Sequence, residues 1–485
     1  MSEYKHGVYG ETGSASNVVD TTQVTTPVYI GTLPMHRLNE SKLANIKHYK
    51  DKDVAMALIT SIKDAKNLNL MSGDWEAYSL CEALDVHFMH DSSIAPIILI
   101  APINNGSTTT KTGTVSLTKS GTSYIGYLND ARAVIKNMAL TVAGVTFEDG
   151  EVSYGYDGDS IKIVVTKENF NANTVEVSYS QIAPAKMDVA TFKKCLEVLD
   201  RAESVTNRIP NILCAPQYSE DPQYHDVMVQ KAIDKIDRKW NMVVATDIGE
   251  VDGIESAIAW KKTNSYINIL EKVCYPKLGY KGKKYHMSTI WTATSQGLDM
   301  DNDNIPYKSA SNKAVFVDTI FSNKDDTVMY ISEEEANELN KNGITTAITT
   351  KGQIRLWGSH MGNYNFDALS NIADEDRFDV AVRMSAYLRN YLQYNYLDEI
   401  DESISRKDID SIINSVQMWL DSLVNESKLL YATVEFDADS DLANGDVVFN
   451  IHVTYPCVVK SITFKVIYTN KGLSVFTPAE EGVEE

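Results

Sequence analysis

Cysteine is scarce in this 485-residue chain, and its spacing excludes the usual roles of cysteine clusters. No CxxC pair occurs and the number of cysteines is odd, so neither a zinc site nor a disulfide framework is predicted. Synthesis in a reducing cytoplasm fits this pattern. The five cysteines are Cys81, Cys195, Cys214, Cys274 and Cys457.

Basic side chains and long apolar runs are also in short supply. The chain carries 45 basic and 66 acidic side chains, and its formal net charge of −21 would repel nucleic-acid phosphates and anionic lipid head groups. The opening MSEYKHGVYGETG lacks the apolar centre of a signal peptide, and the longest apolar run, near residues 97–101, is far shorter than the roughly 20 residues that span a bilayer. Nucleic-acid binding, signal-peptide secretion and membrane anchoring are therefore not expected.

The common catalytic motifs are missing as well. The sequence holds no GxSxG elbow, HExxH, Walker A motif or GxGxxG after a strand. Asp299, Asp301 and Asp303 alternate like the start of a calcium loop, but Asn304 stands where its glycine belongs and Ala310 where its glutamate belongs. A solvated loop is the prediction, and no catalytic, cofactor-binding or metal-binding residue is expected.

Histidine and lysine suggest packing and surface roles. His286 and His452 fall in predicted strands, where a satisfied core or surface imidazole is the usual case. The segment GYKGKKYH, residues 279–286, is expected to run into a strand and so to be a basic surface loop, because a phosphate cradle would have to open a helix. Its lysines could pair with acidic faces of identical subunits.

Length and composition indicate three or four folded domains. Hydrophobic residues make up 43% of the chain and charged residues 23%, which is ordinary for folded proteins. The predicted class is multidomain α/β: a core with an inserted all-β domain, an α+β C-terminal domain and extended arms at both ends. The predicted division is an N-terminal arm (1–26), the first part of the core (27–103), the insertion (104–185), the rest of the core (186–352), the C-terminal domain (353–470) and an acidic tail (471–485).

The core prediction rests on strands that alternate with helices. A strand near 27–33 precedes helical stretches at 53–66 and 75–90 and a strand at 94–102. Further strand and helix patterns follow from residue 187 onward, as parallel βαβ units require. A capping box of Ser332 and Glu335 starts another helix.

The insertion and the C-terminal domain have different patterns. Alternating runs such as TVEVSYS, separated by Asp-Gly turns, predict an immunoglobulin-like β-sandwich between residues 104 and 185. Helices are expected at 374–400 and 407–426, followed by three strands at 429–437, 446–456 and 457–469, with an Asn444-Gly445 turn between the first two.

Several segments in order resemble the contractile tail sheath family of phages and R-type bacteriocins. Each motif is weak alone, but their order and spacing carry the resemblance over nearly the whole chain outside the insertion. Asn304 and Ala310 depart from the glycine and proline of the family loop. The segments are GVYGETG with TTPVYIGTLP, RIPNILCAPQYSEDPQYHDVMVQKA, DNDNIPYKSASNK, ANELNKNGITTAITTKGQIRLWGSHMG and the helix that contains Asp376, Arg377 and Arg383.

The resemblance implies a structural protein rather than an enzyme. Its subunits polymerise as a helical sheath around an inner tail tube, and contraction drives the tube through the target envelope. The implied partners are further copies, the tail tube protein, and baseplate and tail terminator proteins, with no cofactor. The implied location is a virion tail or bacteriocin particle that assembles in the host cytoplasm.

The resemblance also implies where subunits connect. Arms at residues 2–26 and about 458–476 would add strands to neighbouring subunits, although frayed termini are the simpler alternative. The polar face of the helix at 407–426 is the expected tube contact. The arm residues are Val8, Tyr9, Val18, Val19, Ile462, Phe464, Val466 and Tyr468, and the tube-facing residues are Asp410, Asn414, Gln417 and Asp421.

Two other functions are compatible with parts of the sequence. An α/β core also suits an enzyme of unknown reaction, because this fold class hosts many functions. An immunoglobulin-like insertion suits an adhesin or surface-layer protein, which the missing signal peptide opposes.

Overall fold

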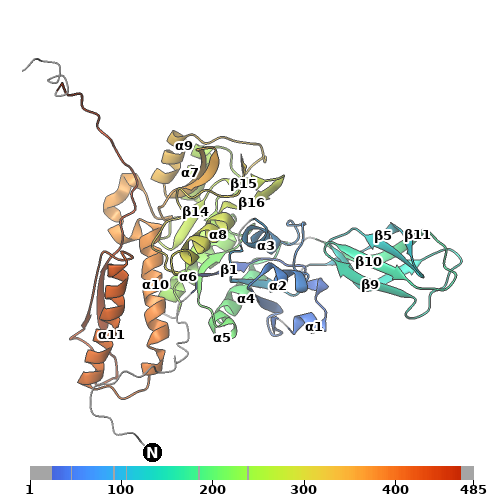
Figure 1. Ribbon diagram of the computed structural model, residues 1–485, viewed down its shortest axis with the longest axis horizontal. Coiled ribbons are helices and arrows are strands. Elements are labelled where there is room, and N and C mark those ends of the chain that lie inside the picture. The colour runs from blue at the N-terminus through green and yellow to red at the C-terminus, as the bar shows by residue number, and fades with distance from the viewer. Residues whose placement is uncertain are drawn as a thin grey trace, which may run out of the picture.

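The computed structural model describes residues 24–44, 46–90, 93–104, 106–183, 186–236 and 240–470. Along the longest axis of the molecule a helical C-terminal part, a central α/β body and an all-β insertion follow one another (Figure 1). Within the described ranges, no helix combines the length and the apolarity that a membrane crossing requires.

The central body is built on one nine-stranded sheet with the order β19-β18-β14-β13-β12-β1-β4-β3-β2. Its six middle strands are parallel, and the flanking β19, β3 and β2 pair antiparallel. Burial on both faces explains the unbroken apolar run of β4, IILIAP. The strands are β1 (Thr26–Ile30), β2 (Lys47–Tyr49), β3 (Val54–Ile59), β4 (Ile97–Pro102), β12 (Pro210–Cys214), β13 (Val243–Asp247), β14 (Glu271–Cys274), β18 (Ile344–Thr350) and β19 (Gln353–Trp357).

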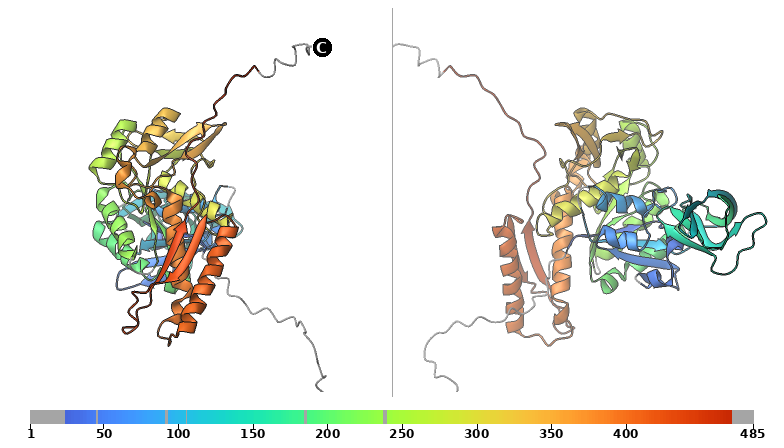
Figure 2. Two further views of the ribbon diagram at one scale, coloured as in Figure 1. Left: turned by 90° about the vertical axis from the view of Figure 1, so that its left-hand side faces the viewer. Right: turned by 45° about the vertical axis from the view of Figure 1, so that its right-hand side comes forward.

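Helices cover both faces of this sheet, as the alternating pattern predicts (Figure 2). α3 and α8 pack together on one face, and α4 and α6 pack together on the other. The short helix α1 and the helices α2, α5, α7 and α9 complete the body. The helices are α1 (Glu40–Leu43), α2 (Ile62–Asn67), α3 (Leu80–Phe88), α4 (Val189–Leu199), α5 (Ala202–Thr206), α6 (Pro222–Ile236), α7 (Ile254–Thr263), α8 (Met287–Met300), α9 (Glu333–Lys341) and the 3-10 turn η1 (Met35–Arg37).

The helix predicted over residues 53–66 is wrong in its first half. Residues 54–59 form β3, which pairs antiparallel with β4 along its whole length. The helix α2 begins only after Ser61, whose side chain accepts a hydrogen bond from the Asp64 amide. A short apolar run such as VAMALI fits a buried strand or a buried helix equally well, and strand pairing decides between them.

The basic segment 279–286 also differs from its prediction. It forms the hairpin of β15 (Lys277–Tyr280) and β16 (Lys283–Tyr285), which pairs with β17 (Thr319–Phe321), and it leads into helix α8 rather than a strand. His286 lies at the start of α8. Lys283 and Lys284 already pair with Asp85 and Asp326 of their own chain.

The insertion consists of two antiparallel sheets around a core of its own. One sheet has the order β5-β11-β8 and the other the order β6-β7-β10-β9. The immunoglobulin-like topology stays a prediction. The strands are β5 (Thr108–Ser116), β6 (Thr118–Ser120), β7 (Ser123–Leu128), β8 (Ala133–Thr141), β9 (Val152–Asp157), β10 (Ser160–Val165) and β11 (Thr174–Ile182).

The insertion is fixed to the body at its base. Its two chain crossings lie side by side, because the Ala183 amide donates to the Ser107 carbonyl at 2.9 Å. Asp159 accepts hydrogen bonds from Arg37 at 2.8 Å and from the Ser72 hydroxyl at 2.6 Å. These polar contacts orient the insertion without merging its core with that of the body.

The C-terminal part packs two long helices against a two-stranded sheet. Leu388 of α10, Leu420 of α11 and Val434 of β20 share one buried core. Helix α11 starts with a capping box between Ser405 and Asp408. The elements are α10 (Asp379–Asn395), α11 (Arg406–Asn425), β20 (Tyr431–Phe436) and β21 (Phe449–Thr454), with the 3-10 turns η2 (Phe366–Asn371), η3 (Asp374–Asp376) and η4 (Leu397–Glu399).

Two predictions for this part are wrong, and one is confirmed. Asn444 and Gly445 form a turn between β20 and β21, within a loop that runs from 437 to 448. The helix expected at 374–400 is limited to α10, because η3 and η4 flank it. The strand expected at 457–469 is not formed among the described residues, because a strand exists only when a partner binds its backbone groups.

Buried ion pairs fasten α10 to the body. Lys272 of β14 has no exposed surface, and its ammonium lies 2.9 Å from the Asp379 carboxylate while donating to the carbonyls of Gly358 and His360. One turn along α10, Arg383 binds Asp299, which is 1% exposed. The solvated loop predicted for the aspartate triplet is therefore wrong for Asp299.

His286 joins three elements of the body through a buried charge cluster. Its ring nitrogen Nδ1 lies 2.8 Å from Glu82 of α3, and Nε2 lies 3.7 Å from Glu220, which precedes α6. Burial alone would lower the pKa of His286, but the two carboxylates outweigh it and raise the pKa to about 10. Burial would raise the pKa of Glu220, but His286 lowers it to about 2. His286 is a core histidine, but it lies at the start of α8 rather than in a strand, and its buried Nε2 has no hydrogen-bond partner among the described residues.

Replacing Lys272 by methionine is expected to destabilise the protein by about 3–5 kcal/mol, because Asp379 would stay buried without its cation. Urea unfolding followed by tryptophan fluorescence measures this loss. Lys262→Met, at an exposed position, is the control and should change the midpoint little. Equal midpoints for the two variants would contradict the role of the buried pair.

The stabilisation from His286 should depend on pH in a defined window. Protonated His286 contributes its full stabilisation of the folded state below pH 6.5, the pKa of histidine in the unfolded chain. This contribution decreases as pH rises toward about 10, the pKa in the folded state. Ionised Glu220 contributes its full stabilisation of the folded state above pH 4.5, the pKa of glutamate in the unfolded chain. This contribution decreases as pH falls toward about 2. His286→Gln should therefore lower the thermal midpoint most near about pH 5.5 and less near about pH 9.5. A deficit of the same size at both values, or one matched by the exposed His452→Gln, would refute this.

Candidate assembly surface

The C-terminal arm, residues 457–470, leaves the body as an extended chain (Figure 2). Ile462, Phe464, Val466 and Tyr468 are 70%, 86%, 96% and 83% exposed. In an extended chain these alternate positions share one side, so they form a continuous apolar row. A row of this kind exposed to water marks an interaction surface.

The sheet of β20 and β21 has edges that a further strand could use. Tyr431 opposes Thr454, and hydrogen-bonded and non-hydrogen-bonded pairs alternate along the two strands. Since Asp437 donates to the Val448 carbonyl, the backbone groups of Phe449, Ile451 and Val453 point away from β20. No other described strand pairs with β21, so this edge is open.

The β20 edge is occupied by a side chain. The amide nitrogen of Gln417 donates to the Ala432 carbonyl at 3.2 Å, and its amide oxygen accepts from the Val434 amide at 3.0 Å. Gln417 thus makes the two hydrogen bonds that a neighbouring strand would make. Of the four residues expected to face the tube, Asp410, Asn414 and Asp421 are exposed, whereas Gln417 is half-buried against β20.

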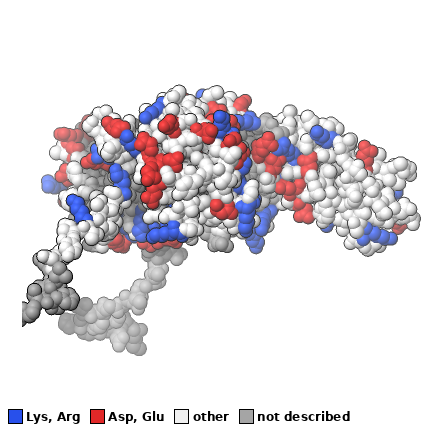
Figure 3. Space-filling view, turned by 90° about the horizontal axis from the view of Figure 1, so that it is seen from above, with Lys and Arg blue, Asp and Glu red and all other residues white. Residues whose placement is uncertain are grey.

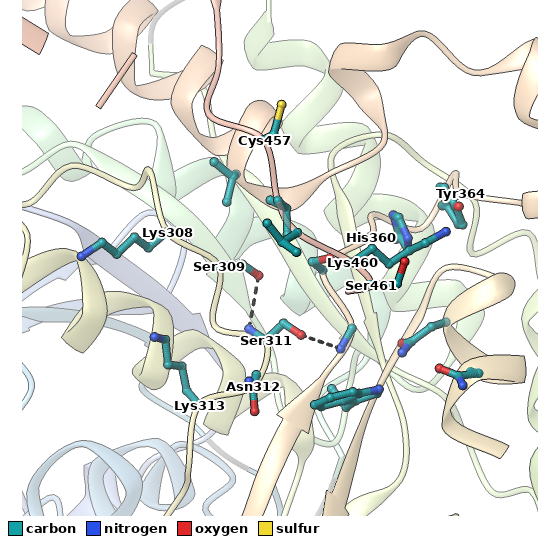
Figure 4. Close-up of a pocket in the computed structure, with 18 of the residues that line it drawn as sticks. Lys308, Ser309, Ser311, Asn312, Lys313, His360, Tyr364, Cys457, Lys460 and Ser461 are labelled. Carbon is teal, nitrogen blue, oxygen red and sulfur yellow. Dashed lines mark hydrogen bonds between the residues drawn. The ribbon is translucent and has the colours of Figure 1, made fainter. Parts of the chain in front are cut away.

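A groove of about 860 Å³ lies at the root of the C-terminal arm (Figure 4). Its lining comes from the loop before β17, helix α9, the segment after β19 and residues 456–462. His360 stacks on Tyr364 with ring centroids 3.4 Å apart. Burial, together with nearby Lys272 and Lys460, lowers the pKa of His360 to about 4, so its ring is neutral at pH 7.

The predicted site residues fall into two groups. The four of the C-terminal arm lie together on its apolar row, whereas Val8, Tyr9, Val18 and Val19 lie outside the described residues. The groove and the role of Gln417 were not predicted. In the parts of the chain that the structure describes, no three His, Cys, Asp or Glu side chains gather as metal ligands.

Solved structures share this fold over nearly the whole chain. A chain of the anti-feeding prophage baseplate is 12% identical, with 96% of this chain and 99% of that chain covered and a TM-score of 0.54. A chain of the contracted sheath complex of PVC, an extracellular contractile injection system, is 11% identical, with 97% and 99% covered and a TM-score of 0.54. The sheath tail protein of Desulfitobacterium hafniense is 11% identical, with 93% and 100% covered and a TM-score of 0.50.

These likenesses establish the fold, and the resemblance read from the sequence motifs is confirmed at that level. No family model matches the sequence, and no curated protein matches it.

Gln417→Ala should expose the Val434 amide to solvent. A hydrogen bond contributes about 1 kcal/mol net, so hydrogen exchange at Val434 is expected to accelerate about fivefold in the monomeric chain. Asn414→Ala, on the exposed side of the same helix, is the control. Unchanged exchange in the Gln417 variant would show that the side chain does not protect the β20 edge.

Proposed function

We propose that the chain is the structural subunit of a contractile sheath, which polymerises as a helical tube around an inner tube and contracts to drive that tube through a target envelope. The observation that carries the proposal is the fold shared with a chain of the contracted PVC sheath complex, over 97% of this chain and 99% of that one. A fold matched along both full lengths supports a common architecture more strongly than a match of one domain. The subunit acts without a cofactor.

Neighbouring subunits are linked by strand addition. The C-terminal arm offers an apolar row at alternate positions, and the open β21 edge offers outward backbone groups beside the half-buried Phe449, Ile451 and Val453. A strand added there would bury both apolar rows and pair both backbones. The N-terminal arm supplies the second linking strand through Val8, Tyr9, Val18 and Val19; it ends before residue 25, because Thr25 is buried beside Asp299 and Thr26 begins β1.

A strand that adds at the β20 edge must first displace the Gln417 side chain, whereas a strand that adds at the β21 edge meets no such side chain among the described residues. A strand can bind Ala432 and Val434 only after Gln417 turns away. The side-chain amide keeps this edge satisfied in a free subunit and is replaced, bond for bond, by an incoming backbone. Unassembled subunits are thereby protected against unspecific pairing at one of their two edges.

The arms allow the sheath to shorten without coming apart. Backbone pairing holds each arm to its neighbour while the bodies rotate, so two packings of the same subunit can interconvert. The exposed polar face of α11, with Asp410, Asn414 and Asp421, contacts the inner tube protein. Baseplate and terminator proteins bind at the two ends of the polymer. The polymer assembles in the host cytoplasm and functions as part of a tail or tail-like particle.

Negative-stain electron microscopy of the purified chain tests this function. The native chain should form hollow tubes, and Phe464→Glu with Val466→Glu should leave dispersed subunits, because two charges would enter the buried apolar row. Thr463→Glu with Thr469→Glu adds the same charge on the other side of the arm and should still give tubes.

Each negative outcome contradicts a different part of the proposal. Dispersed particles from the native chain would argue against a sheath. Tubes from the Phe464 and Val466 variant would exclude the C-terminal arm as a link, and tubes from a chain lacking residues 2–23, which leaves β1 intact, would exclude the N-terminal arm.

A further inference from the structure

The groove at the arm root is lined without any acidic side chain, although the chain carries 66 of them. Four lysines from three segments line it instead, namely Lys308 and Lys313 of the loop before β17, Lys341 of α9 and Lys460 of the C-terminal arm. Lys341 pairs with Asp367 at 3.2 Å. Among the described residues, no carboxylate lies within ion-pair distance of the other three. In a protein of net charge −21, Lys308, Lys313 and Lys460 therefore form a local excess of positive charge that no described carboxylate pairs with.

The rest of the lining suits a peptide rather than a free ion. Ser309 and Ser311 and asparagine side chains also line it (Figure 4). The Ser309 hydroxyl donates to the Asp379 carboxylate at 2.9 Å, and the Gly358 amide donates to the Ser311 hydroxyl at 3.0 Å. Aromatic rings lie between the lysines: Phe366 is 49% exposed, and the Lys460 ammonium lies 5.3 Å from its ring centroid. Alternating cationic and aromatic surface recognises acidic residues interspersed with apolar ones.

One segment of this chain has that composition. Residues 471–485, KGLSVFTPAEEGVEE, carry four glutamates together with leucine, valine and phenylalanine, and they lie outside the described residues. They directly follow the C-terminal arm, which runs away from the body of its own subunit (Figure 2). Fifteen residues reach at most about 50 Å, enough to fill a groove on another subunit.

We propose that the groove of one subunit binds the acidic segment 471–485 of a second copy of this chain. The inference rests on the proposed strand addition, because β21 leads through Tyr455 and Pro456 directly into the groove. An arm that adds parallel to β21 runs toward the groove and therefore delivers its acidic segment to the groove of the same neighbour. Ion pairs in the groove then fasten the end of an arm whose strand is held by backbone hydrogen bonds.

Photo-crosslinking in the full-length polymer tests this docking. The probe is p-benzoylphenylalanine in place of Phe476, in tubes assembled from a mixture of isotopically heavy and light subunits. Mass spectrometry should find crosslinks from position 476 to peptides 307–313 or 357–366, in heavy–light pairs. Lys308→Glu with Lys313→Glu should reduce their yield about tenfold at low salt, because two exposed ion pairs are lost. Adding Glu480→Lys with Glu481→Lys should restore it.

A matched control uses Lys262→Glu with Lys324→Glu, which changes the charge equally at exposed positions outside the groove and should leave the yield unchanged. Crosslinks to other peptides, crosslinks only within heavy or within light subunits, or an equal loss in the control would each overturn the docking. Tubes would persist in those cases, so such a failure is distinct from failure of the sheath proposal, in which the native chain forms no tubes.

Discussion

Two buried ion pairs hold α10 against the α/β body, and the position of the whole C-terminal part depends on them. Lys272 and Asp379 lie beneath the start of α10, and Arg383 binds Asp299 one turn later. A charge removed from water tolerates no loss of its partner, so α10 cannot slide or tilt without a large cost in free energy. The sheet of β20 and β21, which shares a core with α10, is carried at a set orientation to the nine-stranded sheet.

Because the ion pairs fix α10 to the body, any change of shape must involve chain segments outside the body, such as the C-terminal arm. The C-terminal arm makes no strand within its own subunit, and the edge it would use lies on the rigid part of another. Backbone pairing at an edge needs no shaped domain interface, so in the proposed sheath it would persist while the bodies change their relative angles. Gln417 satisfies the β20 edge within one subunit by hydrogen bonds from a single side chain.

Sequence patterns within single segments predicted most helices and strands. They did not predict side-chain contacts between segments that are far apart in the sequence. The capping box of Ser332 and Glu335 is confirmed because all its atoms lie within four residues. The apolar run at 54–59 has no distinctive period, so the sequence predicts a helix where the structure forms strand β3. The burial of Asp299 depends on Arg383, 84 positions away. The groove draws its lysines from residues 308 to 460, so no local motif announces it.

The base of the β insertion has an evolutionary consequence. Its entry and exit are joined by the hydrogen bond from Ala183 to Ser107, so the body needs only two adjacent ends at this point. Any domain whose termini lie close together meets that requirement, and the entropy of closing the connection changes little with its length. Recombination could therefore exchange the insertion for another domain while the α/β body keeps its geometry.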